Sequence, residues 1–353
     1  MKESPFFRKA GKDALCQMCP HFCLVKEGSV GRCGTRRNIG GRLCPIFYGK
    51  PCSIAVDPVE KKPFFHFAPA SLALSVATAG CNFSCRHCQN WEISQSARSG
   101  KADSWQDVPP ASLMSLAKRS GVQGMAWTYT EPTVFFEYFY DTASLDSKKI
   151  LYQAWVSNGF TSIDVIRKAS ELLDAANIDY KGDDGFYKEV CGARLQPVLD
   201  AMKEYRRLGV WLEITNLLIP GHNDGRDDVL QMVSWIRENL GRDVPLHFSA
   251  YHPDFMMKAP PTGTAALEKA ISIADDYLDY VYAGNVLHDR ESTFCPRCKE
   301  MLIRRSGFAV SCISLEKKGS SFFCGSCGRK IPIAGARWMG HTIRLSRKKK
   351  THS

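Results

Sequence analysis

Apolar and polar segments alternate through the middle of the chain in a pattern that predicts strands separated by helices. Short runs dominated by apolar residues are candidate strands at 71–78, 124–130, 150–157, 177–181, 210–218, 245–251 and 280–285. Segments with a helical spacing of apolar residues lie between most of them, at 111–120, 132–142, 162–176, 195–208, 225–239 and 264–277. Such alternation predicts an α/β fold with a parallel sheet, and six or seven units favour a full or partial (β/α)6-type TIM barrel. A doubly wound sheet is the alternative.

Polar side chains stand at or just after almost every predicted strand end. They are Cys81, Glu131, Asn158, Asp179 with Lys181, Asn216, His252 and Asn285. In a (β/α) barrel the carboxyl ends of the strands meet on one face, where active sites lie. The pattern therefore favours a barrel with its functional site on that rim.

Three cysteines at the end of the first predicted strand indicate the chemistry. Cys81, Cys85 and Cys88 have the spacing C-x3-C-x2-C. Because a 4Fe–4S cluster normally binds one cysteine on each iron, three cysteines leave one iron for an exogenous ligand. S-adenosylmethionine (SAM) would chelate it through its amino and carboxylate groups, and an electron from the cluster would release a 5′-deoxyadenosyl radical. Two alternatives stay open on spacing alone. The three cysteines could be ligands of a zinc site, although zinc favours C-x2-C pairs, or they could be unpaired structural thiols.

Two further pairs of residues suggest contacts to SAM. Asp179 and Lys181 point to the same side of a strand, so they either pair as ions or act together, with Lys181 on the SAM carboxylate and Asp179 orienting it. Asn216 and Glu213 are candidate partners of the ribose hydroxyls.

Composition and the chain start place the protein among ordinary globular chains. Its 353 residues are 44% hydrophobic and 24% charged, enough for one large catalytic domain with small appendages. The start has no apolar signal-peptide core and no apolar run reaches membrane-spanning length, so we expect a cytoplasmic protein without a membrane partner. Most of the 15 cysteines fall into three clusters, which favours metal sites over disulfides.

The net charge of +11 raises the question of nucleic-acid binding. Part of the excess lies in the tail at 343–353, and no aromatic residues interleave its terminal basic run, so a solvated tail is favoured. A nucleic-acid-binding zinc protein is the alternative function, and it would bind with a steep salt dependence and without regard to SAM.

Two C-x2-C pairs near the C-terminus predict a second metal site. Cys295 with Cys298 and Cys324 with Cys327 flank a short β-rich stretch, which is typical of a zinc ribbon with one structural Zn²⁺.

A third cysteine group lies near the N-terminus. Cys16, Cys19, Cys23 and Cys33 stand among glycines and offer four ligands. Zinc and an auxiliary Fe–S cluster are both open, with zinc preferred because the sequence shows no redox partner. Cys44, Cys52 and Cys191 have no evident partner and are expected to be packing residues, and Cys312 is expected to take no part in the ribbon site.

Motifs spread over most of the chain carry a family resemblance. They are DPVEKKP at 57–63, GCNFSCRHCQNW at 80–91, YTEPT at 129–133, SNGF at 157–160, LIPG at 218–221, HFS at 247–249 with HP at 252–253, and VYAGN at 281–285. In this order they resemble the radical SAM superfamily, on the branch of the pyruvate formate-lyase activating enzymes. The closest resemblance is to the AmmeMemoRadiSam system radical SAM enzyme family.

The resemblance implies roles for individual residues. Cys81, Cys85 and Cys88 would hold the cluster, and Asn158, Lys181 and His252 match SAM-contacting positions. The segment ending in Glu131 stands where relatives have a Gly-Gly-Glu-Pro stretch that receives the SAM amino group, but both glycines are missing. His87 replaces the larger aromatic residue usual before the third cysteine.

We therefore expect a radical SAM enzyme that abstracts hydrogen from a substrate the sequence does not identify. The expected organisation is a cysteine-rich module at 1–66, a core barrel at 67–290, a zinc ribbon at 291–342 and a basic tail at 343–353. The alternative is an activating enzyme that makes a glycyl radical on a partner protein. The resemblance further implies an electron donor such as flavodoxin or ferredoxin, and Memo-like and AMMECR-like proteins as partners.

Overall fold

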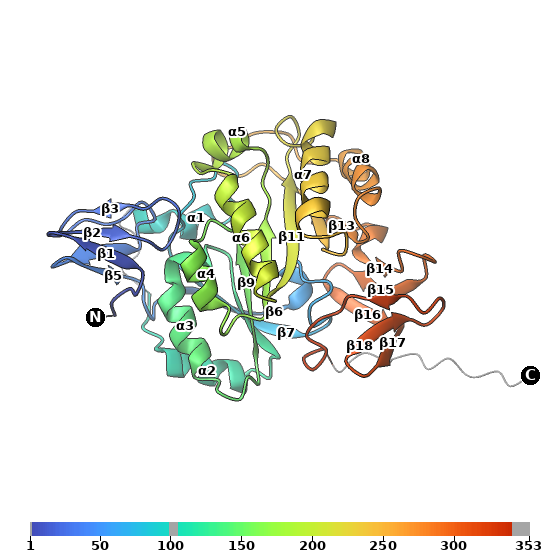
Figure 1. The fold of residues 1–353 in the computed structure, drawn as a ribbon, viewed down its shortest axis with the longest axis horizontal. Helices are drawn as coiled ribbons and strands as arrows, with labels where there is room; N and C mark the ends of the chain where they lie inside the picture. The colour runs from blue at the N-terminus through green and yellow to red at the C-terminus, as the bar shows by residue number, and fades with distance from the viewer. Residues whose placement is uncertain (1, 99–104, 341–353) are drawn as a thin grey trace, which may run out of the picture.

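The computed structural model describes residues 2–98 and 105–340. A large α/β core lies between a small β module formed by the N-terminal residues and two β-sheets formed by the C-terminal residues (Figure 1). The predicted basic tail at 343–353 lies outside the described residues.

An eight-stranded sheet forms the core, with the order β13-β12-β11-β10-β9-β8-β7-β6. Its strands are β6 (Pro51–Pro58), β7 (Leu72–Thr78), β8 (Gly124–Trp127), β9 (Tyr152–Ser157), β10 (Ala175–Asp179), β11 (Trp211–Leu218), β12 (Leu246–Ala250) and β13 (Val281–Gly284). All neighbours from β7 to β13 pair in parallel, whereas β6 runs antiparallel to β7. Because β13 and β6 stand at opposite edges, the barrel is open. The predicted α/β fold with a partial TIM barrel is confirmed, and the seven parallel strands coincide with the seven predicted ones.

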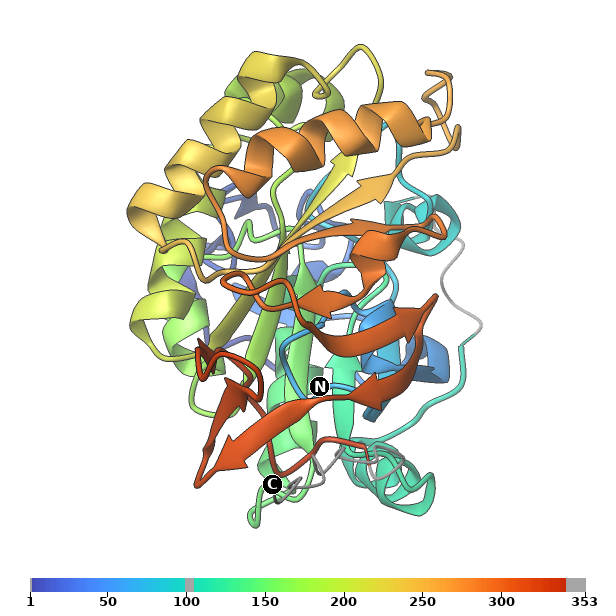
Figure 2. The same ribbon diagram turned by 90° about the vertical axis from the view of Figure 1, so that its right-hand side faces the viewer.

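Helices cover the outer face of this sheet (Figures 1 and 2). They are α2 (Pro110–Arg119), α3 (Phe136–Ser144), α4 (Ile163–Ala169), α6 (Gln196–Arg207), α7 (Arg226–Asn239) and α8 (Thr264–Asp275). The helix predicted at 162–176 is too long, because α4 ends at Ala169 and β10 already begins at Ala175. Ala175 and Ala176 are fully buried and pair with both β9 and β11, so sheet pairing there overrides the helical preference of alanine. No described helix has the length and apolar character needed to cross a membrane.

The edge strand β6 was not expected from the sequence. It lies in the segment assigned to the N-terminal module, so the core sheet starts before residue 67. Pro51 and Pro58 stand at its two ends, where proline is tolerated in an edge strand.

The N-terminal module consists of short antiparallel strands. One sheet contains β1 (Phe7–Ala10), β2 (Asp13–Cys16) and β3 (Leu24–Val25), and a hairpin joins β4 (Arg36–Ile39) to β5 (Arg42–Pro45). The buried Arg36 anchors the module to the core through two hydrogen bonds of 2.7 and 2.8 Å to the carboxylate of Glu137 on α3.

The C-terminal residues form two three-stranded antiparallel sheets, which we call the ribbon. They contain β14 (Thr293–Phe294), β15 (Met301–Ser306) and β16 (Ala309–Ile313), and β17 (Leu315–Lys318), β18 (Ser321–Cys324) and β19 (Lys330–Ile331). Figure 2 shows them in front of the core strands. Their apolar side chains pack together with Phe65, Tyr280 and Tyr282 of the core.

Candidate active site at the carboxyl ends of the strands

A pocket of about 300 Å³ lies at the carboxyl ends of the parallel strands. The cysteines Cys81, Cys85 and Cys88 all line it. The remaining walls come from the ends of the other strands and from the segment after β6: Lys61, Lys62, Phe83, His87, Gln89, Asn90, Ser94, Thr128, Tyr129, Thr130, Val156, Ser157, Asn158, Asp179, Lys181, Thr215, Leu217, Ser249 and Asn285. The predicted position of the site on the barrel rim therefore agrees with the pocket that contains the thiols.

The cysteine loop leaves β7 through Gly80, whose φ of +94° is accessible to glycine and costly for other residues. Two backbone hydrogen bonds fix the loop against the segment before α6, from Ser84 N–H to the Cys191 carbonyl at 2.9 Å and from Arg86 N–H to the Val190 carbonyl at 3.0 Å. The loop thus turns all three thiols into one cavity.

Two hydrogen-bond donors lie near the sulfur atom of Cys81. The Phe83 N–H lies 3.4 Å and the Asn158 Nδ2 lies 3.7 Å from the Cys81 Sγ. Burial raises the pKa of the Cys81 thiol well above its usual value. A free thiolate is therefore unfavourable there, and bound metal would supply the missing positive charge. Three thiols, N–H donors and a neighbouring open pocket fit a 4Fe–4S cluster with one iron left for another ligand.

Cys191, which the sequence left without a partner, lies against the cysteine loop. Its thiol hydrogen-bonds to Cys85, and this contact together with burial raises the pKa of the Cys85 thiol. The side chain is fully buried. Cys191 thus contacts one of the three loop thiols. The spacing of cysteines in the sequence could not reveal this contact, because Cys191 lies far from the loop along the chain.

Asp179 and Lys181 form an ion pair of 2.7 Å on the rim. Both of the readings offered by the sequence are compatible with this geometry, because both side chains also line the pocket. Burial by itself would lower the pKa of Lys181, but Asp179 and the nearby Cys85 raise it well above its usual value. The ammonium is therefore charged and stands beside the loop thiols.

Glu131 lies behind the pocket wall and is fully buried. Its carboxylate accepts hydrogen bonds from the Thr133 hydroxyl at 2.7 Å, the Ser157 hydroxyl at 2.9 Å and the Asn158 N–H at 2.8 Å. The side chain therefore holds the backbone of Asn158, which does line the pocket. Glu131 thus fixes the position of Asn158 on the rim. The sequence led us to expect Glu131 on the cavity wall, but its side chain does not line the cavity.

Two other candidates also face elsewhere. Asn216 lies between Thr215 and Leu217, which line the pocket, and its amide donates to the Tyr180 carbonyl at 2.8 Å on the opposite side of the strand. His252 is exposed and is not part of the pocket wall.

Glu213, considered with Asn216 as a ribose partner, is buried near the start of β11. It accepts the N–H groups of Phe65 and His66, both at 2.9 Å, and contacts the His247 ring at 2.8 Å. It belongs to the contact between core and ribbon at the amino end of β11, whereas the rim lies at the carboxyl end of the strand.

Sequence reasoning missed a polar cluster beside the pocket, three of whose members, Lys61, Lys62 and Tyr129, line it. Asp57, at the end of β6, binds Lys61 and Lys62, both at 2.8 Å, and accepts hydrogen bonds from Tyr129 at 2.5 Å and Ser75 at 2.7 Å. Burial lowers the pKa of Lys62 to about 8, although Asp57 opposes this shift. The motif at 57–63 carries Asp57 and the two lysines, whereas Ser75 belongs to β7 and Tyr129 follows β8. The sequence could not show that the lysines reach the pocket.

The ribbon cysteines meet as the sequence predicts. The sulfur atoms of Cys295, Cys298, Cys324 and Cys327 all lie within 4.8 Å of one another. In the part of the chain that the structure describes, no other group of three or more potential ligands is as compact. The group could hold one metal ion.

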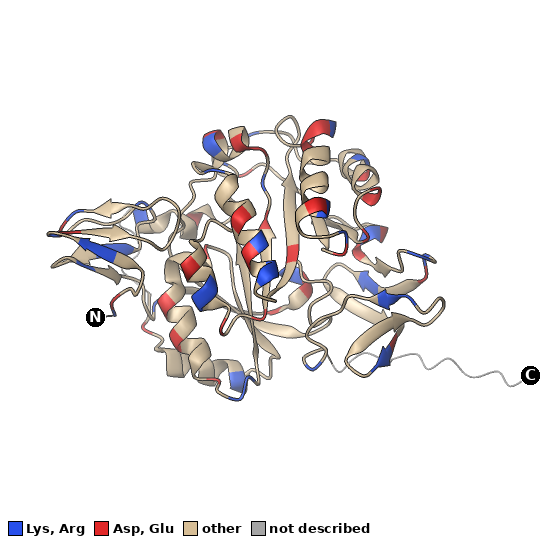
Figure 3. Ribbon diagram, viewed as in Figure 1, with Lys and Arg blue, Asp and Glu red and all other residues tan. Residues whose placement is uncertain are grey.

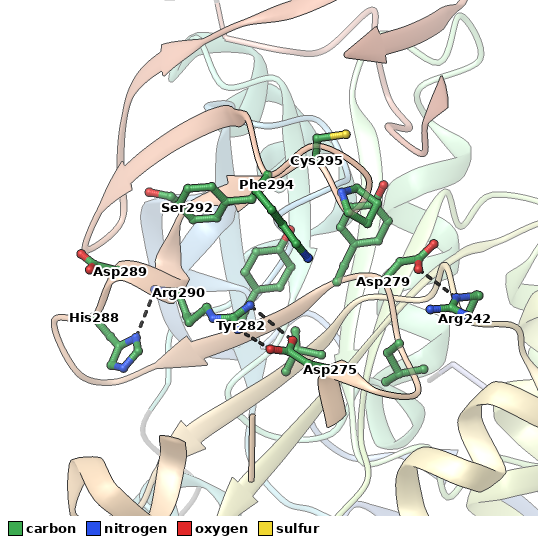
Figure 4. A pocket seen from close by; sticks show the side chains of 15 residues that line it. Arg242, Asp275, Asp279, Tyr282, His288, Asp289, Arg290, Ser292, Phe294 and Cys295 are labelled. Atoms are coloured by element: carbon green, nitrogen blue, oxygen red, sulfur yellow. Dashed lines mark hydrogen bonds and ion pairs between the residues drawn. The ribbon is translucent and has the colours of Figure 1, made fainter. Parts of the chain in front are cut away.

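A larger cavity of about 560 Å³ lies at the junction between core and ribbon (Figure 4). Four of its charged side chains form ion pairs, Arg242 with Asp279 at 2.8 Å and Arg290 with Asp275. None of the three loop cysteines reaches it. The smaller rim pocket is therefore the candidate active site.

Charged residues of both signs are interspersed over the helices and the ribbon in the view of Figure 3. Many of them pair, including Arg167 with Glu204 at 2.8 Å and Lys188 with Asp184 at 2.6 Å.

Comparisons with known proteins match a family to the segment that contains the cysteine loop. The family described as the radical SAM superfamily matches residues 75–236. An uncharacterized protein of Methanocaldococcus jannaschii, MJ0808, is 42% identical over 337 residues, which are 94% of this chain and 99% of that protein. A second protein of that organism, the uncharacterized MJ0674, is 25% identical over 286 residues, or 76% of each chain.

Parts of the chain are also similar to solved structures. A domain of a pyruvate-formate lyase-activating enzyme from Bacteroides vulgatus has a TM-score of 0.41 and 18% identity, and the match covers 46% of this chain and 99% of that one. A radical SAM methyltransferase from Sphaerobacter thermophilus has a TM-score of 0.49 and 11% identity, with 62% of this chain and 68% of that one covered.

Proposed function

The chain belongs to the radical SAM superfamily, and from this premise we propose that it binds a 4Fe–4S cluster and SAM in the rim pocket, cleaves SAM reductively and abstracts hydrogen from a further substrate. One observation carries the proposal: Cys81, Cys85 and Cys88 line the same pocket as the cationic Lys181 and the amide of Asn158.

The residues of the pocket divide into two walls with different tasks. On one wall the three thiolates hold the cluster, Lys181 donates to the SAM carboxylate, and Asp179 keeps the ammonium in place. When bound, the cluster supplies one electron to the SAM sulfonium, whose C–S bond breaks to give methionine and a 5′-deoxyadenosyl radical. Asn158 stands between the cysteine loop and Glu131, so its amide is fixed for a polar contact to SAM.

The other wall is available to the second substrate. Lys61, Lys62 and Tyr129 face the pocket and present ammonium and phenol groups. A substrate with an anionic group would complement this wall, because two lysines share the single carboxylate of Asp57.

The finer assignments are also proposals. We place the chain in the AmmeMemoRadiSam system radical SAM enzyme family, supported by the motifs at 57–63, 80–91 and 281–285. Memo-like and AMMECR-like proteins would then be its partners, and a flavodoxin- or ferredoxin-class protein its electron donor. The four ribbon thiolates would bind Zn²⁺, which favours tetrahedral sulfur sites of this kind.

Replacing all three loop cysteines tests the proposed chemistry. After anaerobic reconstitution and reduction with dithionite, the C81A/C85A/C88A variant should form no 5′-deoxyadenosine above background, because no thiolate holds the cluster beside SAM. Product formation is measured by liquid chromatography with mass detection. Cys52→Ala is the matched control, because Cys52 lies on β6 outside the pocket, and it should cleave SAM at the wild-type rate. Cleavage by the triple variant at the rate of the control would refute the assignment.

A further inference from the structure

The four N-terminal cysteines line one small cavity between the module and the core. Cys16, Cys19, Cys23 and Cys33 all belong to its wall. Cys16 ends β2, and its N–H donates to the Cys23 carbonyl at 2.9 Å, which brings the two segments that carry the first three thiols together. The group is thus assembled by the fold and is not an accident of composition.

Among the described residues, only the ribbon cysteines form a compact group of potential metal ligands. The ribbon sulfurs all lie within 4.8 Å of one another, as ligands of a single ion must. Within the described residues the N-terminal thiols form no set of three that is so compact. Four cysteines around a cluster lie further apart than four around one zinc, because each binds a different iron. Four thiols that line one cavity without forming a compact set of three therefore favour a polynuclear cluster.

A buried cation faces the same cavity. Arg36 is 1% exposed and lines the cavity wall. Its two Nη atoms donate to Glu137, but its Nε has no hydrogen-bond partner in the described structure. An unpaired buried donor of a charged group is costly, and an anionic sulfur of a bound cluster would satisfy it.

The cavity adjoins the loop of the radical SAM site. The residues on either side of Cys81 both contact the N-terminal module. A Cβ atom at Gly80 would lie 2.3 Å from the Thr35 Cγ2 and 2.9 Å from the Cys33 carbonyl oxygen. Asn82 lines the cavity, and its carbonyl lies 2.9 Å from the Nε2 of His21. From the sequence, zinc was the preferred metal because no redox partner was visible. In the fold, the loop of the radical SAM site adjoins this cavity, and a cluster at that site would be such a partner.

We propose that Cys16, Cys19, Cys23 and Cys33 bind a second 4Fe–4S cluster, which relays electrons to the radical SAM site. Four cysteines occupy all four irons, so this cluster has no open position for SAM and can only exchange electrons. A reduced flavodoxin- or ferredoxin-class protein gives it one electron, and the same electron then passes to the rim pocket for each SAM cleaved. The cluster returns to its oxidised state with no net change. The relay rests on the proposed function, whereas the presence of the cluster does not.

Metal analysis of the C81A/C85A/C88A variant tests the cluster independently of SAM cleavage. The anaerobically reconstituted full-length variant should hold about four iron and four sulfide per chain, against about eight of each in the wild type. Its reduced form should give an electron paramagnetic resonance signal that does not change when SAM is added. Adding C19A and C33A to the variant should remove iron and signal together, while zinc in the ribbon stays constant and reports an intact fold.

A triple variant that contains zinc in place of iron, or no iron, would overturn the proposal. If the wild type fails to cleave SAM but the triple variant keeps its four irons, only the proposed function is wrong.

The relay is tested in the C19A/C33A variant, which keeps the three loop cysteines. Reduction of its remaining cluster is followed by loss of absorbance near 400 nm in stopped flow. With reduced flavodoxin the rate should fall at least about tenfold relative to the wild type, whereas dithionite, a small reductant, should act at the wild-type rate. Equal rates with flavodoxin, or slowing with both reductants, would contradict a relay.

Discussion

Lys181 is the residue whose position says most about how the pocket would bind SAM. Its side chain is 13% exposed, stands beside Cys85 and is held by Asp179 at 2.7 Å. The geometry is compatible both with an ion pair alone and with a contact to SAM, because Asp179 and Lys181 both line the pocket. The position of Lys181 beside the thiols that would hold the cluster is the position from which an ammonium can reach a chelating carboxylate.

Lys181→Met separates ligand binding from structure. If the ammonium holds the SAM carboxylate, the substitution should weaken SAM binding by about 1.5–3 kcal/mol, the range for a hydrogen bond to a charged group. Iron content should be unchanged, because Lys181 carries no cluster ligand. The measurements are a binding isotherm and a melting curve on the same protein. Lys188→Met is the control, because Lys188 forms a similar pair with Asp184 on an exposed segment. Unchanged SAM affinity with a lower melting temperature would restrict Lys181 to its ion pair.

The sequence identifies the strand ends on the rim but does not tell which residue at each end faces inward. Glu131 is a predicted SAM contact, and in the structure its carboxylate accepts the N–H of Asn158 from behind the pocket wall. Asn216 was one position away from the pocket-lining Thr215 and Leu217. Side chains alternate across a strand, so an error of one residue moves a side chain to the other face. This error cannot be corrected from the chain alone when polar residues occupy neighbouring positions.

At the scale of elements, the central strands were predicted well because they are nearly continuous apolar runs. All four residues of β8 are buried, and β7 exposes only its first residue. The short strands of the N-terminal module gave no such signal: β3 has two residues and β1 is largely exposed. Contacts with the core support this module, including the buried pair of Arg36 and Glu137. Contacts between distant segments leave no local pattern in the sequence.

Helices α4 and α6 are joined by Glu204. Its carboxylate binds Arg167 of α4 at 2.8 Å and Arg207 of its own helix at 2.7 Å. The hydrogen bond from Arg207, together with Arg167, lowers the pKa of Glu204 to about 2. Both arginine side chains are more than half exposed, so solvent screens the interaction.

Glu204→Gln should lower the free energy of unfolding by about 1 kcal/mol at pH 7, the upper part of the range for exposed ion pairs. Because the folded-state pKa lies below the unfolded value near 4.5, the contribution is complete above that value and is lost as the pH falls toward about 2. The gap between wild type and variant in urea unfolding should therefore close over this range. Glu238→Gln, on an exposed position of α7, should show a small gap without this pH dependence. A gap that is the same at pH 7 and at pH 3 would contradict the linkage.

At the scale of the whole molecule, the ribbon lies at the end of the barrel opposite the rim pocket. Arg305 of β15 donates to the Phe65 carbonyl at 2.6 Å, and the Ala68 N–H donates to the Ala334 carbonyl at 2.9 Å. Glu213, near the start of β11, accepts hydrogen bonds from Phe65 and His66 of the same core loop. The ribbon and the amino ends of the strands therefore form one packed region. The ribbon therefore packs against the amino ends of the barrel strands. Its metal would contribute to the stability of the fold more than to SAM cleavage.

Removing the ribbon metal tests this division. The full-length wild type should contain about one zinc per chain outside its iron sites, held by four thiolates. Cys298→Ser should lose that zinc and lower the melting temperature, because metal binding contributes to the folding free energy of a module with a small core of its own. The rate of SAM cleavage well below the melting temperature should change less than about twofold, since no ribbon residue lines the rim pocket. Cys312→Ser, a ribbon cysteine outside the metal group, should keep both zinc and stability. A zinc-free Cys298→Ser protein that melts with the wild type would show that the four cysteines hold no structural metal. Loss of SAM cleavage at unchanged stability would instead show that the ribbon communicates with the rim along the strands, against the division of roles that the fold implies.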